Sequence, residues 1–225
     1  AYHRTTAIVL RCTDFSETSQ VVAMITPDLG QVHALAKGAR RPRKDGRMPL
    51  DLLNHCDVVL SLRPAGRLHL LAEWTVRDHF TRLRGDLRSL WCACQAAELA
   101  LRTTSENPDD GTLAEALLDL LCRLEEGQAP ELTLCRFLAR ALLALGNAPI
   151  ADRCAQCGHS LDGPTRFSPS AGGALCGDCG AVDPQSFSLS RGACAVMHRL
   201  EADAGMIDRL RISAEQAHEI RRAFT

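Results

Sequence analysis

The chain has 225 residues, of which 46% are hydrophobic, and its formal net charge is −1. It is long enough for one large domain or two to three small ones with a buried core, and no stretch of about eighteen apolar residues offers a membrane span. The first eleven residues are charged at Arg4 and Arg11 and lack an apolar segment, so we expect no signal peptide and a cytoplasmic location.

Eleven cysteines would suit a secreted disulfide scaffold, but their distribution indicates otherwise. Four of them form two Cys-x-x-Cys pairs, and the other seven are scattered among apolar neighbours, as small buried side chains are. We therefore expect a reducing compartment, in which the scattered cysteines stay as thiols.

The first eighty residues predict five short strands, because short apolar stretches rich in β-branched residues alternate with turn residues. The stretches lie at 7–10, 21–25, 32–36, 56–62 and 68–74. Five such strands suit a small barrel of the oligonucleotide/oligosaccharide-binding (OB) type, although an open five-stranded sheet would give the same pattern. In the last strand we expect one buried face, made of Leu68, Leu70, Ala72 and Trp74.

A basic segment lies between the third and fourth predicted strands. Residues 37–47 hold six cations and one anion, and the cations are Lys37, Arg40, Arg41, Arg43, Lys44 and Arg47. On an OB barrel such a segment predicts binding to a nucleic-acid backbone, whereas the alternative is an ordinary solvated loop. Because few of the nine aromatic residues fall in the strands, we expect electrostatic, salt-dependent binding with weak sequence specificity.

From about Thr81 the apolar period changes to that of a helix, which predicts a helical bundle. The first predicted helix has one apolar face, made of Leu83, Leu87, Leu90, Trp91, Cys94, Ala97 and Leu101. Two further helices are predicted at 112–126, opened by a capping box, and at 131–145, ended by Gly146. Arg136 and Arg140 share a face of the last of these, and the simplest interpretation of that face is solvent-exposed charge.

Eighteen residues separate Cys154-x-x-Cys157 from Cys176-x-x-Cys179. This spacing is typical of a zinc site, because each pair presents two thiolates from one short turn and four thiolates complete a tetrahedron. Two redox dithiols or a disulfide are the alternatives. His159 is expected to be a bystander, since four cysteines already close the coordination shell. We predict one structural zinc ion and no catalytic metal.

The predicted organisation is α+β and multidomain. Residues 1–80 form an OB-fold DNA-binding domain, 81–153 the first part of a helical domain, 154–184 a zinc-binding cassette, and 185–225 the last helices of the helical domain. The final helix follows a second capping box at Ser213–Gln216. Phosphate-loop, dinucleotide-binding, zinc-protease and hydrolase motifs are absent from the sequence, which favours a non-enzymatic binding protein.

Taken together, these features resemble the bacterial recombination mediator RecO family, involved in DNA repair. The motifs that carry the resemblance are the strand Ala7–Leu10, the segments Phe15–Ser19 and Leu35–Arg41, the helix Arg136–Gly146, the knuckle Cys154–Gly158, and Phe167–Pro169 with Gly172 and Gly173 before the second cysteine pair. Each is weak alone, but they occur in the right order and cover most of the chain.

The resemblance implies a protein that binds single- and double-stranded DNA and anneals complementary strands at the nucleoid. It implies association with RecR, action with RecF in helping RecA replace single-stranded DNA-binding protein, and contact with the acidic tail of that binding protein. The DNA contacts carry over to Lys37, Arg40 and Arg41, and their extension to Arg43, Lys44 and Arg47 rests on charge alone. Arg136 is the candidate for the tail contact, because a guanidinium can clamp a terminal carboxylate.

Two other interpretations stay open at this point. One is a zinc-ribbon adaptor or RNA-binding protein of transcription or translation, in which the basic segment contacts RNA or a protein partner. The other is an enzyme that uses Cys154 and Cys157 as a redox dithiol.

Overall fold

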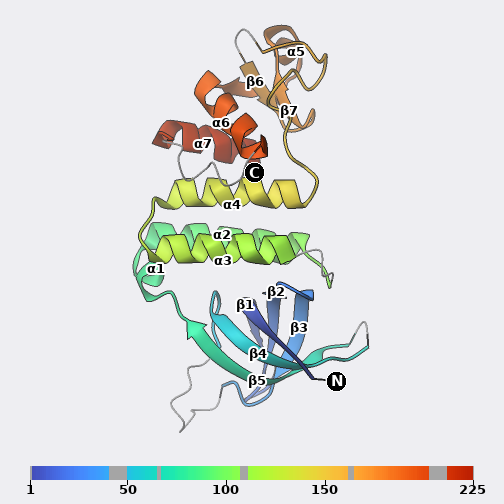
Figure 1. The fold of residues 1–225 in the computed structure, drawn as a ribbon, viewed down its shortest axis with the longest axis vertical. Coiled ribbons are helices and arrows are strands. Elements are labelled where there is room, and N and C mark those ends of the chain that lie inside the picture. Colours follow the sequence, from blue (N-terminus) through green and yellow to red (C-terminus); the bar gives the residue numbers. More distant parts are fainter. Residues whose placement is uncertain are drawn as a thin grey trace. The chain divides into compact units, whose positions relative to one another are not determined.

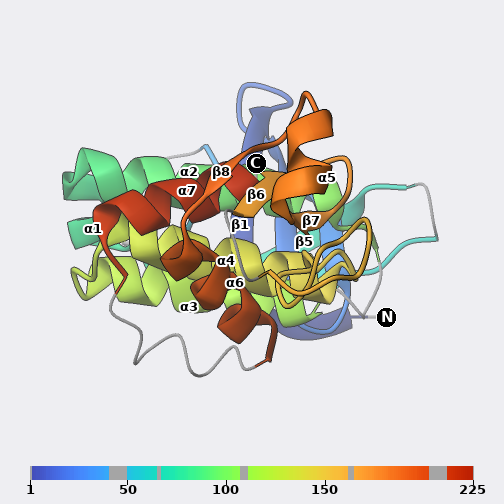
Figure 2. The ribbon, with the colours of Figure 1, turned by 90° about the horizontal axis from the view of Figure 1, so that it is seen from above.

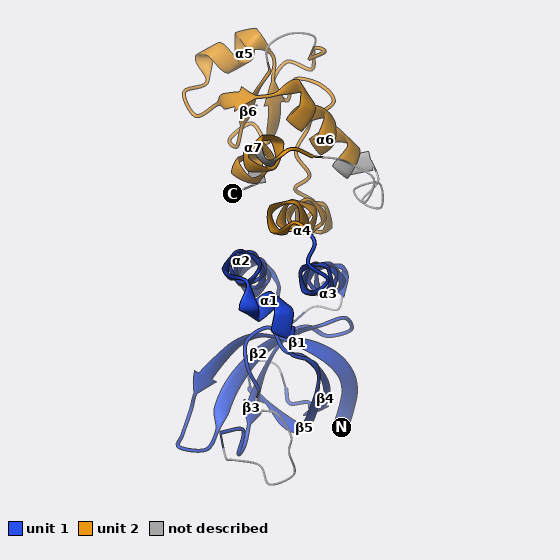
Figure 3. Cartoon of the chain, turned by 90° about the vertical axis from the view of Figure 1, so that its left-hand side faces the viewer, with its two compact units in different colours: residues 1–128 blue, residues 129–225 orange. Residues whose placement is uncertain are grey.

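The computed structural model describes residues 2–40, 50–64, 67–106, 111–161, 165–202 and 212–224. The chain divides into two compact units, Ala1–Gln128 and Ala129–Thr225 (Figure 3). The first unit contains strands and helices in succession, and the second contains helices around a small sheet (Figure 1). The predicted α+β architecture, with five strands followed by helices and a clustered set of four cysteines, is confirmed.

Five strands of the first unit close into an OB-like barrel in the order β1-β2-β3-β5-β4. They are β1 (Tyr2–Asp14), β2 (Gln20–Thr26), β3 (Gly30–Ala36), β4 (His55–Ser61) and β5 (His69–Asp78). The first half of β1 pairs with β4 and its second half pairs with β2, with a bulge between Val9 and Arg11, so this one long strand closes the ring. The interior is filled by apolar side chains, among them Val9, Met24, Val32, Leu60 and Trp74.

The buried face predicted for β5 is wrong in part. Trp74 is buried as predicted, but Leu68 and Ala72 are exposed, and Leu71 lies in the core in their place. The reason is a register shift in the β4–β5 ladder, where Val59 pairs with Glu73 but the next residue pairs with Leu71. Ala72, between Leu71 and Glu73, is therefore left without a pairing partner on β4. This extra residue exchanges the two faces of the strand, so a strict alternation of buried and exposed residues does not predict them.

Three helices complete the first unit: α1 (Thr81–Gly85), α2 (Leu87–Thr103) and α3 (Gly111–Glu125). The single helix predicted from Thr81 is wrong, because Asp86 is extended and its side chain accepts a hydrogen bond from the backbone N–H of Ser89 at 2.9 Å, which starts a new helix. Because α2 starts anew at this cap, its buried face does not continue that of α1, and Leu87 and Trp91 are exposed. The buried face of α2 consists of Ser89, Cys92, Ala93, Ala96, Ala97 and Ala100.

The apolar face predicted for the next helix is confirmed in α3, where all of its leucines are buried: Leu113, Leu117, Leu120, Leu121 and Leu124. Small residues on α2 and large ones on α3 complement each other where these two helices pack together. The first unit thus consists of a barrel and a helical layer, in which α2 contacts β1 and β2 and α3 contacts β2.

The second unit begins with α4 (Pro130–Ala144), which packs against α6 (Arg191–Ala202) and α7 (Ala214–Phe224) (Figure 2). Between α4 and α6 lie β6 (Thr165–Ser168), β7 (Gly173–Leu175), α5 (Gly177–Val182) and β8 (Phe187–Leu189), with the strands in the order β7-β6-β8. The predicted capping box on α7 is confirmed by reciprocal hydrogen bonds between Ser213 and Gln216, of 2.9 and 3.2 Å.

The sheet and the helices of the second unit share one apolar core, which includes Cys135, Phe167, Phe187, Met197 and Ile220. The thiol of Cys135 on α4 donates to the carbonyl of Ala217 on α7 at 3.3 Å. In this division α4 therefore belongs with the cysteine region and the last helices. The sequence-based boundaries near residues 80, 153 and 184 stay predictions about domains. Among the described residues, no helix is both long and apolar enough to cross a membrane.

Candidate nucleic-acid interface and metal centre

Lys37 and Arg40 lie on a turn that directly follows β3, and both side chains are exposed. Gly38 adopts a φ of 70°, which a residue with a side chain rarely adopts, and this bends the chain sharply. Ala39 is only 3% exposed and belongs to the barrel core. The buried methyl group of Ala39 thus anchors the turn, while the cation on each side of it faces solvent.

Arg40 also joins the turn to the loop between β1 and β2. Its backbone N–H donates to the carbonyl of Thr18 at 3.2 Å, and its Nη1 donates to the carbonyl of Ser16 at 3.3 Å. The same Nη1 lies 3.2 Å from the carboxylate of Asp14. A guanidinium has five N–H donors, and with this side chain 42% exposed it can still reach a phosphate oxygen.

The remaining predicted DNA contacts, Arg41, Arg43, Lys44 and Arg47, lie outside the described residues. The structure therefore brings together two of the six predicted cations, Lys37 and Arg40, at one edge of the barrel. It adds the loop 15–19, whose sequence carries part of the family resemblance but predicts no contact with the basic segment. This contact joins segments about twenty residues apart, so no local sequence pattern reveals it.

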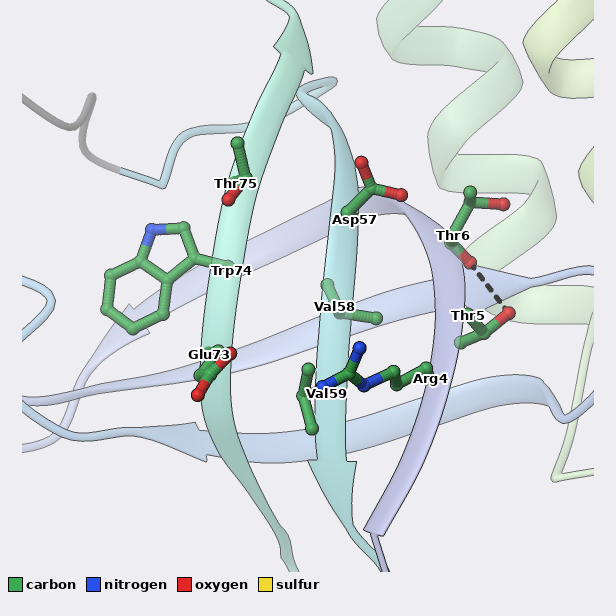
Figure 4. Close-up of a pocket in the computed structure, with 9 residues that line it drawn as sticks. All are labelled: Arg4, Thr5, Thr6, Asp57, Val58, Val59, Glu73, Trp74 and Thr75. Carbon is green, nitrogen blue, oxygen red and sulfur yellow. Dashed lines mark hydrogen bonds between the residues drawn. The ribbon is translucent and has the colours of Figure 1, made fainter.

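A hollow of about 430 Å³ lies elsewhere on the barrel, across β1, β4 and β5 (Figure 4). Arg4 on β1 pairs with Val59 on β4, which in turn pairs with Glu73 on β5. The side chain of Arg4 extends across β4 over Val59 (Figure 4). Asp57 also lines the hollow and is held by Arg77 through an ion pair of 2.7 Å. The lining of this hollow holds two carboxylates, Asp57 and Glu73, against one cation, Arg4, so it suits a polyanion poorly.

The four predicted metal ligands, Cys154, Cys157, Cys176 and Cys179, lie together in the second unit. Their sulfur atoms all lie within 4.8 Å of one another, and the sulfurs of Cys157 and Cys176 are 3.8 Å apart. Four thiolates at about 2.3 Å from a zinc ion have sulfur–sulfur separations of about 3.8 Å, so the cluster fits one tetrahedral ion. None of the eleven cysteines, all of which lie in the described ranges, forms a disulfide in this structure.

Backbone hydrogen bonds shape the two cysteine turns in the same way. The N–H of Gly158 donates to the carbonyl of Cys154, and the N–H of Gly180 donates to that of Cys176, both at 2.9 Å. Gly158 needs its φ of 74°, a left-handed conformation that glycine adopts without strain. A Cβ on Gly180 would approach the side chain of Arg166 to 2.6 Å, so that glycine is required by packing.

The thiols of the cluster differ in their ease of ionisation. Burial opposes the thiolate of Cys154, but backbone N–H groups of Cys176, Cys157 and Gln156 donate to its sulfur and lower its pKa to about 6. The sulfurs of Cys176 and Cys157 raise the pKa of Cys179 to about 12. Full ionisation of all four thiols therefore needs a cation that compensates their charge, as a bound metal ion would.

His159 lies beside the cluster, with its Nδ1 3.5 Å from the sulfur of Cys157. Its backbone carbonyl accepts a hydrogen bond of 2.8 Å from the N–H of Cys154, so the residue closes the first cysteine turn through its main chain. The four sulfurs form the cluster without its imidazole.

Arg136 is not the solvent-exposed charge that the simplest interpretation of α4 suggested. Only 8% of it is exposed, and it lies between Cys135 and Phe137, which are both buried. Arg140, one turn further along, is half-buried. A buried guanidinium is expensive unless its N–H groups meet acceptors, so burial distinguishes Arg136 from a charge on a solvated surface.

Comparison with known proteins agrees with both halves of the chain. The family models described as "Recombination protein O N terminal" and "Recombination protein O C terminal" match residues 1–80 and 84–225. A protein named DNA repair protein RecO from Roseiflexus sp. (strain RS-1) is 36% identical over 202 residues, which cover 89% of this chain and 70% of the relative.

Proteins of the same name from other bacteria match as broadly. The one from Anaeromyxobacter sp. (strain K) is 35% identical over 202 residues, covering 89% of this chain and 79% of the relative. The one from Symbiobacterium thermophilum is 31% identical over 230 residues, covering all of this chain and 90% of the relative. The chain is a member of the RecO family of recombination proteins.

Proposed function

We propose that this protein is a non-enzymatic mediator of recombinational DNA repair that binds single- and double-stranded DNA through the barrel. Membership of the RecO family supports a role in DNA repair and recombination. The observation that carries the DNA-binding surface is the turn at 37–40, where a buried Ala39 holds Lys37 and Arg40 outward on an OB-like barrel. A substrate of chromosomal DNA places the protein at the nucleoid, in the cytoplasm.

The proposed mechanism is electrostatic. Lys37, Arg40 and the cations of the following segment neutralise phosphates, which releases condensed counterions and reduces the repulsion between two strands. Complementary strands held at this surface can then approach and pair. The protein itself forms and breaks no covalent bond in this mechanism.

The proposed partners are RecR, with which the protein associates, and RecF and RecA, with which it acts on DNA coated by single-stranded DNA-binding protein. Arg136 is the proposed contact for the carboxylate at the end of that binding protein's tail. A guanidinium can hold a carboxylate through two parallel hydrogen bonds, which supports this role.

The proposed cofactor is one structural Zn²⁺ ion held by Cys154, Cys157, Cys176 and Cys179. When bound, the ion would stabilise the fold of the second unit, because ligands that are far apart in the unfolded chain are held at one point. Four protein sulfurs complete the shell, so the site offers no open position for a substrate. The redox-dithiol alternative requires that the cysteines work without a metal, and stoichiometric zinc that does not exchange would remove it.

A double variant, Lys37→Ala with Arg40→Ala, tests the proposed surface. We expect weaker binding to single-stranded DNA and a plot of log K against log salt whose slope is shallower by about 1.4, because each lost phosphate contact removes about 0.7. Fluorescence anisotropy with a labelled oligonucleotide over a range of salt concentrations measures both quantities.

The matched control is Arg102→Ala, which removes an arginine that is 76% exposed and paired with Glu98 on α2. This control should keep the wild-type slope. An unchanged slope in the double variant would refute the role of the turn, and a preference for RNA over DNA in the wild type would favour the adaptor alternative.

A further inference from the structure

Phe15 is the first residue of the loop between β1 and β2, and its side chain is 63% exposed. The β1–β2 ladder ends at the pair Asp14 and Gln20, so the ring stands where the hairpin leaves the barrel wall. Single exposed apolar side chains are common on proteins, so exposure alone does not indicate a site. The hydrogen bonds of the loop and its contact with the basic turn are what distinguish Phe15.

The loop that carries Phe15 is held in one conformation by its own hydrogen bonds. The N–H groups of Phe15 and Ser16 both donate to the carbonyl of Ser19, at 3.0 and 3.2 Å. The N–H of Ser19 donates back to the hydroxyl of Ser16 at 3.2 Å. A ring on a pre-organised loop loses little freedom when it binds, so more of the contact energy appears as affinity.

The same loop is bonded to the basic turn. Arg40 donates to the carbonyls of Thr18 and Ser16, and Gln20 at the end of the loop pairs with Ala36, the residue before Lys37. An exposed aromatic ring and two exposed cations therefore belong to one hydrogen-bonded cluster of loops. Within this cluster Arg40 offsets Asp14, and Glu17 adds one further negative charge.

An aromatic face beside cations is the combination that recognises single-stranded nucleic acid, because a base stacks on the ring while the cations hold the adjacent phosphates. In a duplex the bases are already stacked on one another and their faces are not available. We propose that Phe15 is a base-stacking platform that makes the barrel prefer single-stranded over double-stranded DNA. This inference rests on the proposed function of Lys37 and Arg40.

The test compares Phe15→Ala with wild type on a labelled oligo(dT) and on a hairpin duplex of the same length. We expect about a tenfold loss of affinity for oligo(dT), as for a lost stacked base, and duplex binding within about twofold of wild type. The salt dependence should keep its slope, because the ring carries no charge. Phe15→Trp should retain the preference, and Phe15→Leu should lose it.

Tyr2→Ala is the matched control, because Tyr2 is an aromatic residue that is 75% exposed at the opposite end of β1. It should leave both affinities unchanged. The platform would be refuted if Phe15→Ala lost affinity equally for oligo(dT) and for the duplex, or if Phe15→Leu kept the full affinity for oligo(dT). Failure of the proposed function is a separate result, namely binding that does not respond to Lys37→Ala with Arg40→Ala.

Discussion

Ala39 is buried in the barrel, whereas Lys37 and Arg40 beside it are exposed. The sequence groups six cations by charge, three of which also match the family motif, and the structure gives two of them, Lys37 and Arg40, a defined place. The charge pattern was readable because it is local. The contact of Arg40 with Ser16 and Thr18, and the exposure of Phe15 beside it, depend on strand pairing and were not foreseen.

Arg136 illustrates a similar limit at the scale of one residue. An arginine four residues from another on a helix usually marks a solvated face, yet Arg136 is 8% exposed. Which face of α4 is covered depends on its packing with α6 and α7, which come after the whole cysteine region in the chain. The position of a charge along a helix therefore did not predict its burial.

Replacement of one cysteine of the cluster tests the metal site. Cys176→Ser should abolish stoichiometric zinc and destabilise the protein by about 4 kcal/mol or more, as expected for the loss of a structural metal. Elemental analysis of the purified variant gives the zinc content, and thermal unfolding gives the loss of stability.

The control for this variant is Cys122→Ser, which replaces an exposed cysteine on α3 outside the cluster. It should retain zinc and change the stability little. Normal zinc content in Cys176→Ser would count against a site of four thiolates.

At the scale of elements, the strands and most helices were predictable because alternation and helical periodicity are local signals. Buried faces were assigned wrongly where one residue interrupted the periodic pattern. An extra residue in β5 exchanged the two faces of that strand, and the Asp86 cap ended one helix and started another. Such interruptions depend on the register of strand pairing or on a side-chain hydrogen bond. Periodicity counted across them assigns the wrong face, as it did for Leu68 and Leu87.

The start of α3 against the β2–β3 turn offers a test of packing between elements. A Cβ on Gly111, the first residue of α3, would collide with the backbone carbonyl of Pro27. A backbone atom cannot move aside as a flexible side chain can, so Gly111→Ala should destabilise the protein by about 1–3 kcal/mol. Chemical denaturation of the variant and the wild type measures this difference.

Gly85→Ala is the matched control, since a Cβ on Gly85 meets nothing within 4 Å. That substitution should be neutral or stabilise the protein by up to about 1 kcal/mol, because it restricts the unfolded chain. If Gly111→Ala and Gly85→Ala had the same free energy of unfolding, the close approach of α3 to the β2–β3 turn would not require glycine at position 111.

At the scale of the whole molecule, the chain consists of two compact units, and the cysteine cluster lies in the second. Two Cys-x-x-Cys pairs predicted the cluster because the chemistry of a tetrahedral ion fixes both ligand type and spacing. The sequence grouped the last helices with the earlier helical segment that contains α4, and contacts such as Cys135 to Ala217, which span 82 residues, join α4 to α7.

We propose that the barrel brings DNA strands together through the basic turn, and annealing of complementary oligonucleotides that are first coated with single-stranded DNA-binding protein tests this. We expect the wild type to anneal them and Lys37→Ala/Arg40→Ala/Arg41→Ala to fail while it remains folded and binds zinc. A wild type that binds zinc but does not anneal would refute the proposal and favour the adaptor alternative.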